Sequence, residues 1–553
     1  NYNSPSFYNN PDPGFAGHTN IAFGTNGVAY RSSYQNTAAT LENWLTWDKR
    51  FGEHHINAVV GYSWQNNTTG DGLQASNTNF LSDYTGYNTL WLGNYQQVQS
   101  SYNVDFGGTY YQETRFISDF GRLNYNYKDK YLLQASVRRD GSSIFGKNKE
   151  WGYFPSVGAA WRISQEDFMN NITAISELKL RASYGETGNA FGLGAYTSQQ
   201  LFTRQGTYYD NGSVFAAAYG ITQGANADLQ WEVTSTKNIG LDYALLKNRI
   251  TGSIDVYEKE TSNMIFGYRV SPALVPGGFI YANGGKLRNR GIEFNVNFNA
   301  VSTKDFTWTT GLNLASNKNV ILDLHGPAKY GINSDSLRYS YPEGPGMSGV
   351  SVQILSTGHA VGEFFTQVYR GKDDKGQSLF AKHAGKDTTV PTPVKEDFFS
   401  GSPHPKLLVG WSNSFRYKNF DLNLFFRGVF GNKIFNATRA NLSYTQNATT
   451  NNLIATAYDD AMTDARNNTY STRYIENGAY VRLDNATLGY RVPVKNDYIK
   501  SLRFYVTGNN IFVITKYKGV DPEVNMGGIA LGVDNNNFYP KTRTILFGAS
   551  VGF

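Results

Sequence analysis

The final stretch of the chain, residues 541–553 (KTRTILFGASVGF), constrains the fold most strongly. Every second residue there is apolar: Ile545, Phe547, Ala549, Val551 and Phe553. In a β-strand such residues share one face, and the residues between them, mostly small or polar, share the other. A soluble sheet seldom exposes an apolar edge strand, because such an edge invites aggregation. A closed barrel in a membrane has no edge and turns its apolar face to lipid, so the stretch favours an outer-membrane barrel.

The composition agrees with this interpretation. The chain has 553 residues with 39 Tyr, 35 Phe and 57 Gly, and 15% of its residues are aromatic. Aromatic residues gather where the lipid-facing band of a barrel meets water. No apolar run reaches the roughly 18 residues that a membrane helix needs. Barrel strands lack such runs, because only alternate residues are apolar.

Several function classes are disfavoured. The net charge of +6 is mild and no basic run occurs, so we expect no nucleic-acid partner. There is no cysteine, which excludes disulfides and thiolate chemistry. The first residues (NYNSPSFYNNPDPG) do not form a signal peptide. Since an exported barrel carries one, we expect further residues before Asn1.

Alternating segments recur along the whole chain and predict an all-β, transmembrane antiparallel β-barrel. Short turns, such as residues 52–55 and 128–130, alternate with loops of tens of residues, such as 66–111 and 320–405. About fifteen strands are predicted, beginning near Thr40, Ile56, Glu113, Tyr131, Trp151, Leu178, Leu229, Ile250, Arg288, Phe306, Leu407, Phe420, Ala479, Leu502 and Thr542.

The two faces of these strands differ in polarity. In GIEFNVNFNA, Ile292 and Phe294 alternate with Glu293 and Asn295. Polar residues on the inner face indicate a wet lumen, whereas the interior of a soluble sandwich is dry. By the same alternation we expect four residues to line the lumen: Arg138, Glu293, Asn295 and Arg427. Alternatively, the two arginines pair with acidic neighbours.

In outer-membrane barrels the short turns are periplasmic and the long loops extracellular. The C-terminus is therefore expected in the periplasm. Residues 1–39 are predicted to be an extracellular loop or linker, and residues 40–553 the barrel. An odd number of strands that begins with a downward strand predicts that the barrel is incomplete on its N-terminal side.

Several segments, in order, resemble the SusC/RagA family of TonB-dependent outer-membrane transporters of Bacteroidota. They include RRDGSSIFG with WGYFPSVGAAWRISQEDF (138–168), LKLRASYGETGN (178–189) and LQWEVTSTKNIGLD (229–242). NGGKLRNRGIEF (283–294), AYVRLDNATLGYRVP (479–493) and LRFYVTGNNIFVITKYKGVDPEVN (502–525) continue the series. The resemblance implies a 22-stranded barrel, of which these strands are the last fifteen.

The resemblance also implies a function: import of oligosaccharides or peptides beneath a SusD-like surface lipoprotein, driven by TonB. The plug and the TonB box of such transporters have no counterpart here, so we expect them on an upstream segment of the same protein. The barrel would contact outer-membrane lipid and lipopolysaccharide. Phe547 and Phe553 resemble the signal read by the barrel-assembly machinery. The alternative is a plugless passive porin or a structural outer-membrane component.

For substrate contact the best candidates are four aromatic residues of one long loop: Tyr84, Tyr87, Trp91 and Tyr95. Their faces can stack on sugars while their polar tips donate hydrogen bonds. Alternatively, they pack the loop onto the barrel or touch the lipoprotein. We expect no catalytic residue, cofactor or metal: His54 and His55 are adjacent in a turn, and Asp373 and Asp374 lack the calcium-loop spacing.

Overall fold

The computed structural model has an antiparallel sheet of fifteen strands as its main element. It describes residues 2–3, 28–70, 73–78, 90, 103–105, 111–210, 214–342, 344, 349–391, 395–449, 452–459, 464, 466–494, 498–524, 527–535 and 539–553. The strands, in sheet order, are β3 (Asn36–Phe51), β4 (His54–Thr69), β7 (Gln112–Tyr127), β8 (Tyr131–Ser142), β9 (Trp151–Arg162), β10 (Ile175–Asn189), β13 (Glu232–Leu245), β14 (Ile250–Ser262), β17 (Lys286–Ser302), β18 (Phe306–Asp323), β25 (Leu407–Tyr417), β26 (Phe420–Phe430), β29 (Tyr480–Val492), β30 (Ser501–Thr515) and β32 (Thr544–Gly552).

The fifteen predicted strands are confirmed, with small shifts at their ends. β3 begins at Asn36 rather than Thr40, and β10 at Ile175 rather than Leu178. β13 begins at Glu232 rather than Leu229, because Leu229 is fully buried in a cluster with Phe145. Alternation defines the middle of a strand well, whereas contacts outside the sheet decide where it ends.

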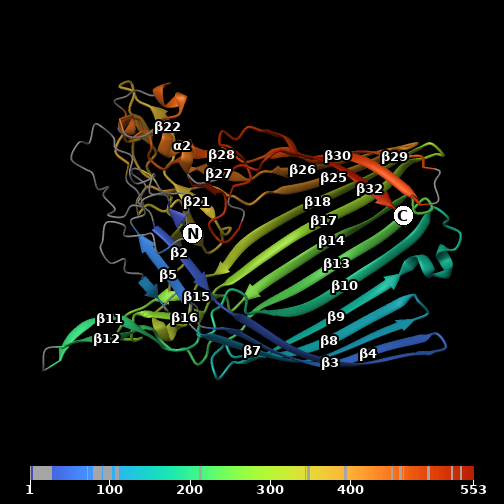
Figure 1. Cartoon of the computed structure of the whole chain (residues 1–553), viewed down its shortest axis with the longest axis horizontal. Helices are drawn as coiled ribbons and strands as arrows, with labels where there is room; N and C mark the ends of the chain where they lie inside the picture. The colour runs from blue at the N-terminus through green and yellow to red at the C-terminus, as the bar shows by residue number, and fades with distance from the viewer. Residues whose placement is uncertain are drawn as a thin grey trace.

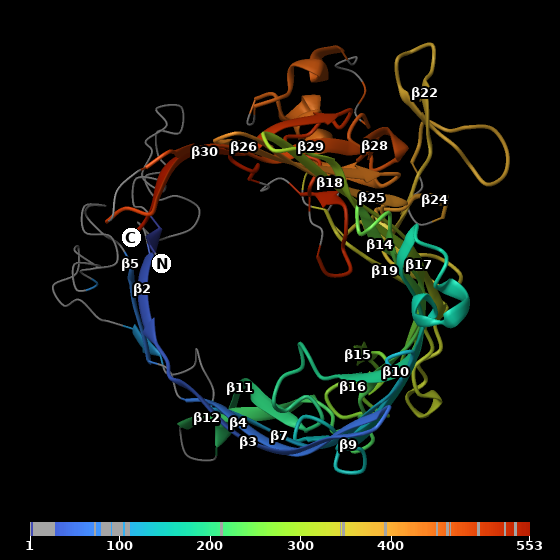
Figure 2. The same cartoon turned by 90° about the vertical axis from the view of Figure 1, so that its right-hand side faces the viewer.

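The sheet curls into most of a ring (Figure 2). Its two edges are β3 and β32, and backbone pairing between described residues joins each strand only to its neighbours in the order above. Every residue of β3 is exposed, and Phe547 of β32 is 84% exposed. In the part of the chain that the structure describes, each edge strand therefore pairs with one neighbour and has no strand beside its other edge.

The two faces of the sheet are chemically distinct. The register places Ile239 of β13 beside Val256 of β14, and Val256 beside Ile292 of β17. The residues between them in sequence, such as Asp255 and Glu293, lie on the opposite face. Ile239 and Val256 are 62% and 54% exposed, as suits an apolar face that lipid covers.

The connections at the two ends of the sheet differ greatly in length (Figure 1). At one end, the short-turn end, β3 meets β4 through Gly52 and Glu53, and Gly52 has φ +59, which glycine adopts freely. At the other, the long-loop end, residues 324–406 join β18 to β25, and residues 431–479 join β26 to β29. No described helix is both apolar enough and long enough to cross a membrane.

The long-loop end carries its own secondary structure. Its small sheets are formed by β1 (Tyr2–Asn3), β2 (Val28–Ser33), β5 (Leu73–Thr78) and β6 (Asn103–Asp105); β11 (Leu201–Asp210) and β12 (Val214–Gln223); β15 (Ile265–Arg269) and β16 (Phe279–Asn283); β19 (Ser336–Tyr339), β20 (Gln353–Ser356), β21 (Glu363–Thr366) and β24 (Phe398–Gly401); β22 (Tyr369–Lys372) and β23 (Ser378–Phe380); and β27 (Lys433–Asn436), β28 (Ile475–Asn477) and β31 (Val533–Asp534). Its described helices are α2 (Ala437–Leu442), η6 (Ala328–Tyr330), η7 (Thr445–Asn447), η8 (Ala455–Asp459) and η9 (Thr472–Tyr474). Two more short helices, η4 (Ile163–Gln165) and η5 (Asp167–Met169), lie between β9 and β10 at the short-turn end.

Candidate functional site at the long-loop end

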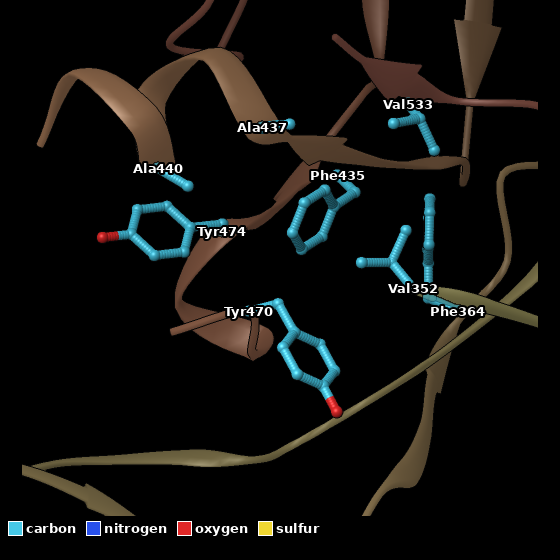
Figure 3. Packing of buried hydrophobic residues seen from close by; sticks show 8 residues of the cluster. All are labelled: Val352, Phe364, Phe435, Ala437, Ala440, Tyr470, Tyr474 and Val533. Carbon is cyan, nitrogen blue, oxygen red and sulfur yellow. The ribbon is translucent and has the colours of Figure 1, made fainter. Parts of the chain in front are cut away.

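Three of the long loops share one apolar core (Figure 3), which we call the loop core. It contains Val352, Phe364, Phe435, Ala437, Ala440, Tyr470, Tyr474 and Val533. The first two residues come from the loop after β18, the last from the loop after β30, and the others from the loop after β26. Parallel pairing of β27 with β31 joins two of these loops through the backbone. The loops thus form one packed unit.

Buried polar contacts hold the same loops together. The hydroxyl of Tyr339 donates to the carbonyl of Ile529 at 2.8 Å. The amide of Gln353 donates to the carbonyl of Leu531 at 2.7 Å. Asp397 is fully buried and accepts from Nη1 of Arg338 in its own loop at 2.7 Å and from the hydroxyl of Tyr470 in the loop after β26 at 3.1 Å. Since an unpaired buried carboxylate is costly, these contacts favour one arrangement of the loops.

A second cluster, the arginine clamp, joins the loop after β30 to the sheet. Arg427 of β26 lies opposite Arg482 of β29. Nη2 of Arg427 donates to Oε2 of Glu523 at 2.9 Å, and Nη2 of Arg482 donates to Oδ1 of Asp521 at 2.6 Å. The clamp consists of Arg427, Arg482, Asp484, Asp521, Glu523 and Lys541.

The centre of the clamp is shielded from solvent. The side chains of Arg482 and Asp521 are 1% and 5% exposed. Burial raises the pKa of Glu523, but hydrogen bonds from Arg427 and Lys541 outweigh burial and lower that pKa from 4.5 to about 2. Nε of Arg427 also donates to Oδ2 of Asp484 at 2.6 Å. The carboxylate of Glu523 therefore stays ionised and helps to hold the loop against the sheet at neutral pH.

A cavity of about 900 Å³ lies between the β15–β16 hairpin and residues 324–337. Aromatic rings, aliphatic side chains and a guanidinium line it, among them Phe266, Tyr268, Arg269, Tyr330 and Leu337. The Tyr268 hydroxyl is buried and has no hydrogen-bond partner within the described structure. Burial raises the pKa of Tyr268 to about 12, so the phenol remains a hydrogen-bond donor. Such a lining suits a bulky ligand with C–H faces and polar groups.

The residues predicted to line the lumen all lie on the polar face of the sheet and have polar neighbours. Nε of Arg138 donates to Asp140 at 2.7 Å. Glu293 lies opposite Asp255, and Asn295 donates to Asn313. Arg427 belongs to the arginine clamp, so both predicted arginines pair with acidic neighbours. Contact of these four residues with a permeating substrate stays a prediction.

Other predicted residues are placed as follows. Tyr84, Tyr87, Trp91 and Tyr95 lie outside the described residues. Phe547 lies on β32 opposite Val506, and Phe553 is 79% exposed just beyond the end of β32. Their role in barrel assembly stays a prediction. His55 binds Asp48, and no group of metal-ligating side chains occurs among the residues described.

Sequence reasoning found Arg427 but not its partners. Asp521 and Glu523 stand out in the segment GVDPEVN, yet Glu523 lies 96 residues from Arg427 in the chain. No local pattern predicts such a contact. The cavity was missed as well. A sequence pattern that could have indicated the cavity is the strand-like segment NMIFGYRV, followed by PGG and then by FIYAN. This pattern predicts an aromatic hairpin between β14 and β17.

A large antiparallel barrel wall with one apolar face, one polar face and packed loops at one end defines an outer-membrane β-barrel protein. The family described as "TonB dependent receptor-like, beta-barrel" matches residues 1–511. The chain belongs to this family, and the family places it in the outer membrane.

Two sequence relatives confirm the resemblance to SusC. The chain is 33% identical to TonB-dependent receptor P3 of Formosa agariphila, over 94% of this chain and 53% of the relative. It is 32% identical to TonB-dependent receptor SusC of Bacteroides thetaiotaomicron, over 80% of this chain and 44% of SusC. The chain thus spans about half the length of these relatives. Both are named receptors, in agreement with the prediction that this chain is not an enzyme.

Among solved structures, the RagAB peptide transporter has the same fold. The TM-score is 0.79 at 24% identity, covering 95% of this chain and 56% of the RagAB chain. A second RagAB structure, in its "open-open" state, gives a TM-score of 0.78 at 23% identity, covering 95% of this chain and 56% of that chain. The predicted all-β barrel fold is therefore confirmed.

Proposed function

We propose that this chain forms most of the barrel wall of a SusC-like TonB-dependent importer of bulky nutrients, oligosaccharides or peptides. The observation that carries the proposal is the large cavity at the long-loop end, with aromatic and polar lining, beside loops that a shared core holds in place. Loops that are held in one arrangement on a barrel scaffold suit selective capture of a ligand.

The partners follow from the same proposal. A SusD-like lipoprotein would sit over the loop core, which offers a fixed surface rather than separate mobile loops. The long-loop end would face outward and the C-terminus the periplasm, as in other outer-membrane barrels. An upstream segment of the same protein would supply the plug, the TonB-binding segment and further strands to pair with the edges β3 and β32.

Uptake by a strain that expresses the full-length protein tests this function. Fluorescently labelled oligosaccharide and peptide pools are supplied to the wild type, to a strain without TonB and to a Tyr268→Ala variant. We expect accumulation of one pool, its loss without TonB, and up to about tenfold weaker half-saturation in the variant, since the aromatic ring of Tyr268 no longer lines the cavity. Tyr458→Ala, at an exposed site in another long loop, is the control.

Passive entry would contradict the proposal. If labelled solutes enter liposomes containing the purified protein, or enter cells equally without TonB, the protein is a porin. If neither labelled pool accumulates in cells and neither enters the liposomes, the protein is a structural component of the outer membrane.

A further inference from the structure

The apolar face of the sheet carries a row of charged side chains from four neighbouring strands, which we call the charged row. The register places Lys237 of β13 opposite Glu258 of β14, Glu258 opposite Arg290 of β17, and Arg290 opposite Lys318 of β18. These residues share the face of Ile239, because each lies an even number of positions from an apolar residue of that face. The row therefore points outward, away from the polar face.

Apolar rows follow directly on the short-turn side. The next row contains Ile239, Val256 and Ile292, and the one after it Leu241, Ile254 and Phe294. From Lys237 to Leu245 a strand rises about 26 Å. A tilt of roughly 40° reduces this to about 20 Å along the membrane normal, close to the ~25 Å apolar band of a barrel. The charged row thus marks the long-loop border of the lipid-facing band.

A groove of about 750 Å³ lies along this border. The charged row lines it, and so do Ala159 and Ala182, whose small side chains leave space on the outer face. Val157 and Ile239 form its apolar walls. The groove has apolar walls toward the short-turn end and cations toward the long-loop end. This arrangement matches an amphiphile with an anionic head group.

The charge of the row is positive. Three cations face one carboxylate, Glu258, which binds Arg290 and lies 3.5 Å from Lys237. The side chains of Lys237 and Arg290 are still 67% and 59% exposed. Exposed cations at the border of a bilayer attract the phosphates of anionic lipids.

We propose that the charged row and its groove bind lipopolysaccharide of the outer leaflet, the row holding a phosphate group and the groove an acyl chain. Two observations favour lipopolysaccharide. The charged row has a surplus of positive charge, and it lies toward the long-loop end, which is extracellular in outer-membrane barrels. The inference needs only the membrane location of the chain and is independent of what the protein imports.

Titration of lipid A into the full-length, detergent-purified protein, followed by native mass spectrometry, tests the site. The triple variant Lys237→Gln, Arg290→Gln, Lys318→Gln is compared with Lys259→Gln, which removes a cation at the same height on the opposite face. Since each cation contributes about fivefold in affinity, the triple variant is expected to bind roughly a hundredfold more weakly. Lys259→Gln is expected to bind like the wild type.

Ligand arms identify the chemistry. Dephosphorylated lipid A is expected to bind the wild type and the triple variant alike, and inorganic phosphate not to compete. Equal affinity of the triple variant and the wild type for lipid A contradicts the proposal. The proposal is also contradicted if the wild type binds phosphatidylglycerol as tightly as lipid A. It is contradicted as well if the triple substitution removes a second copy of the protein from the complex instead of a lipid. If the triple variant does not show heat-modifiable mobility, the single variant Lys318→Gln takes its place.

Discussion

At the scale of single residues, Arg482 shows how the chain holds a loop against its barrel wall. Its guanidinium is almost fully buried, lies 5.5 Å from the ring centre of Tyr480 and binds Asp521. A buried pair contributes little by itself, because desolvation offsets attraction. Removal of one partner is different, since it leaves the other charge buried and alone.

Arg482→Ala is therefore expected to destabilise the attachment of the loop by about 3–5 kcal/mol. Limited proteolysis within residues 516–543 would measure this, with cleavage appearing at far lower protease concentration than in the wild type. Arg138→Ala is the control, because Arg138 is 49% exposed and its pair with Asp140 contributes about 0–1 kcal/mol. Equal resistance of the two variants would contradict the role of the clamp.

The clamp also predicts a pH dependence. The pKa of Glu523 is lowered from 4.5 to about 2, so its charge stabilises the fold fully above pH 4.5. That contribution is lost as the pH falls from about 4.5 towards 2. The difference in Tm between the wild type and Glu523→Gln should be constant from pH 7 to pH 5 and then shrink. A constant difference down to pH 3 would show that the charge of Glu523 is not responsible.

At the scale of elements, the sequence predicts the sheet and misses the loops for one physical reason. A barrel strand such as β17 repeats its alternation over many residues, so local pattern suffices. Short strands such as β27 and β31 form only because Phe435 and Val533 meet in the loop core. Their cause is tertiary, and no window of the sequence contains it.

Phe435→Ala should therefore loosen the loops and leave the barrel wall intact. A buried Phe→Ala change costs about 3–5 kcal/mol through lost burial and the cavity left behind. Hydrogen exchange should quicken in residues 431–449 and 350–366, with unchanged exchange in β17 and β18. Tyr458→Ala, at a 65% exposed site of the same loop, should change neither. Faster exchange throughout the sheet would mean that the loops and the wall are one cooperative unit.

The direction of β10 can be tested with a matched pair of cysteines. Phe168 lies before β10 at the short-turn end and is 64% exposed, and Phe191 lies after it and is 94% exposed. The chain has no native cysteine, so labelling is specific. In intact cells an impermeant maleimide should label Phe191→Cys, and Phe168→Cys only after the outer membrane is opened. The reverse pattern would invert the proposed orientation.

At the scale of the whole molecule, the fifteen strands and the polarity of their faces can be predicted from the sequence, whereas the strands that form the two edges of the sheet cannot. The edges are known only from the strand pairing of the structure, in which β3 and β32 each pair on one side only among the described residues. Edge N–H and C=O groups cost several kcal/mol each in hydrocarbon. The barrel must close before it is stable in a bilayer.

We expect residues 1–553 expressed alone not to give a closed, heat-modifiable barrel. The full-length protein should give one, because in our proposal further strands would pair with β3 and β32. Electrophoresis of unheated and heated samples distinguishes the two. A stable closed pore formed by residues 1–553 in planar bilayers would refute the need for further strands.

The shared loop core has a consequence for how this protein can change. Phe364, Phe435 and Val533 come from three loops but fill one space, so a new side chain in one loop alters the room left for the other two. We expect substitutions there to be strongly non-additive. Altered ligand preference would then arise through sets of compensating replacements across all three segments rather than through independent single steps.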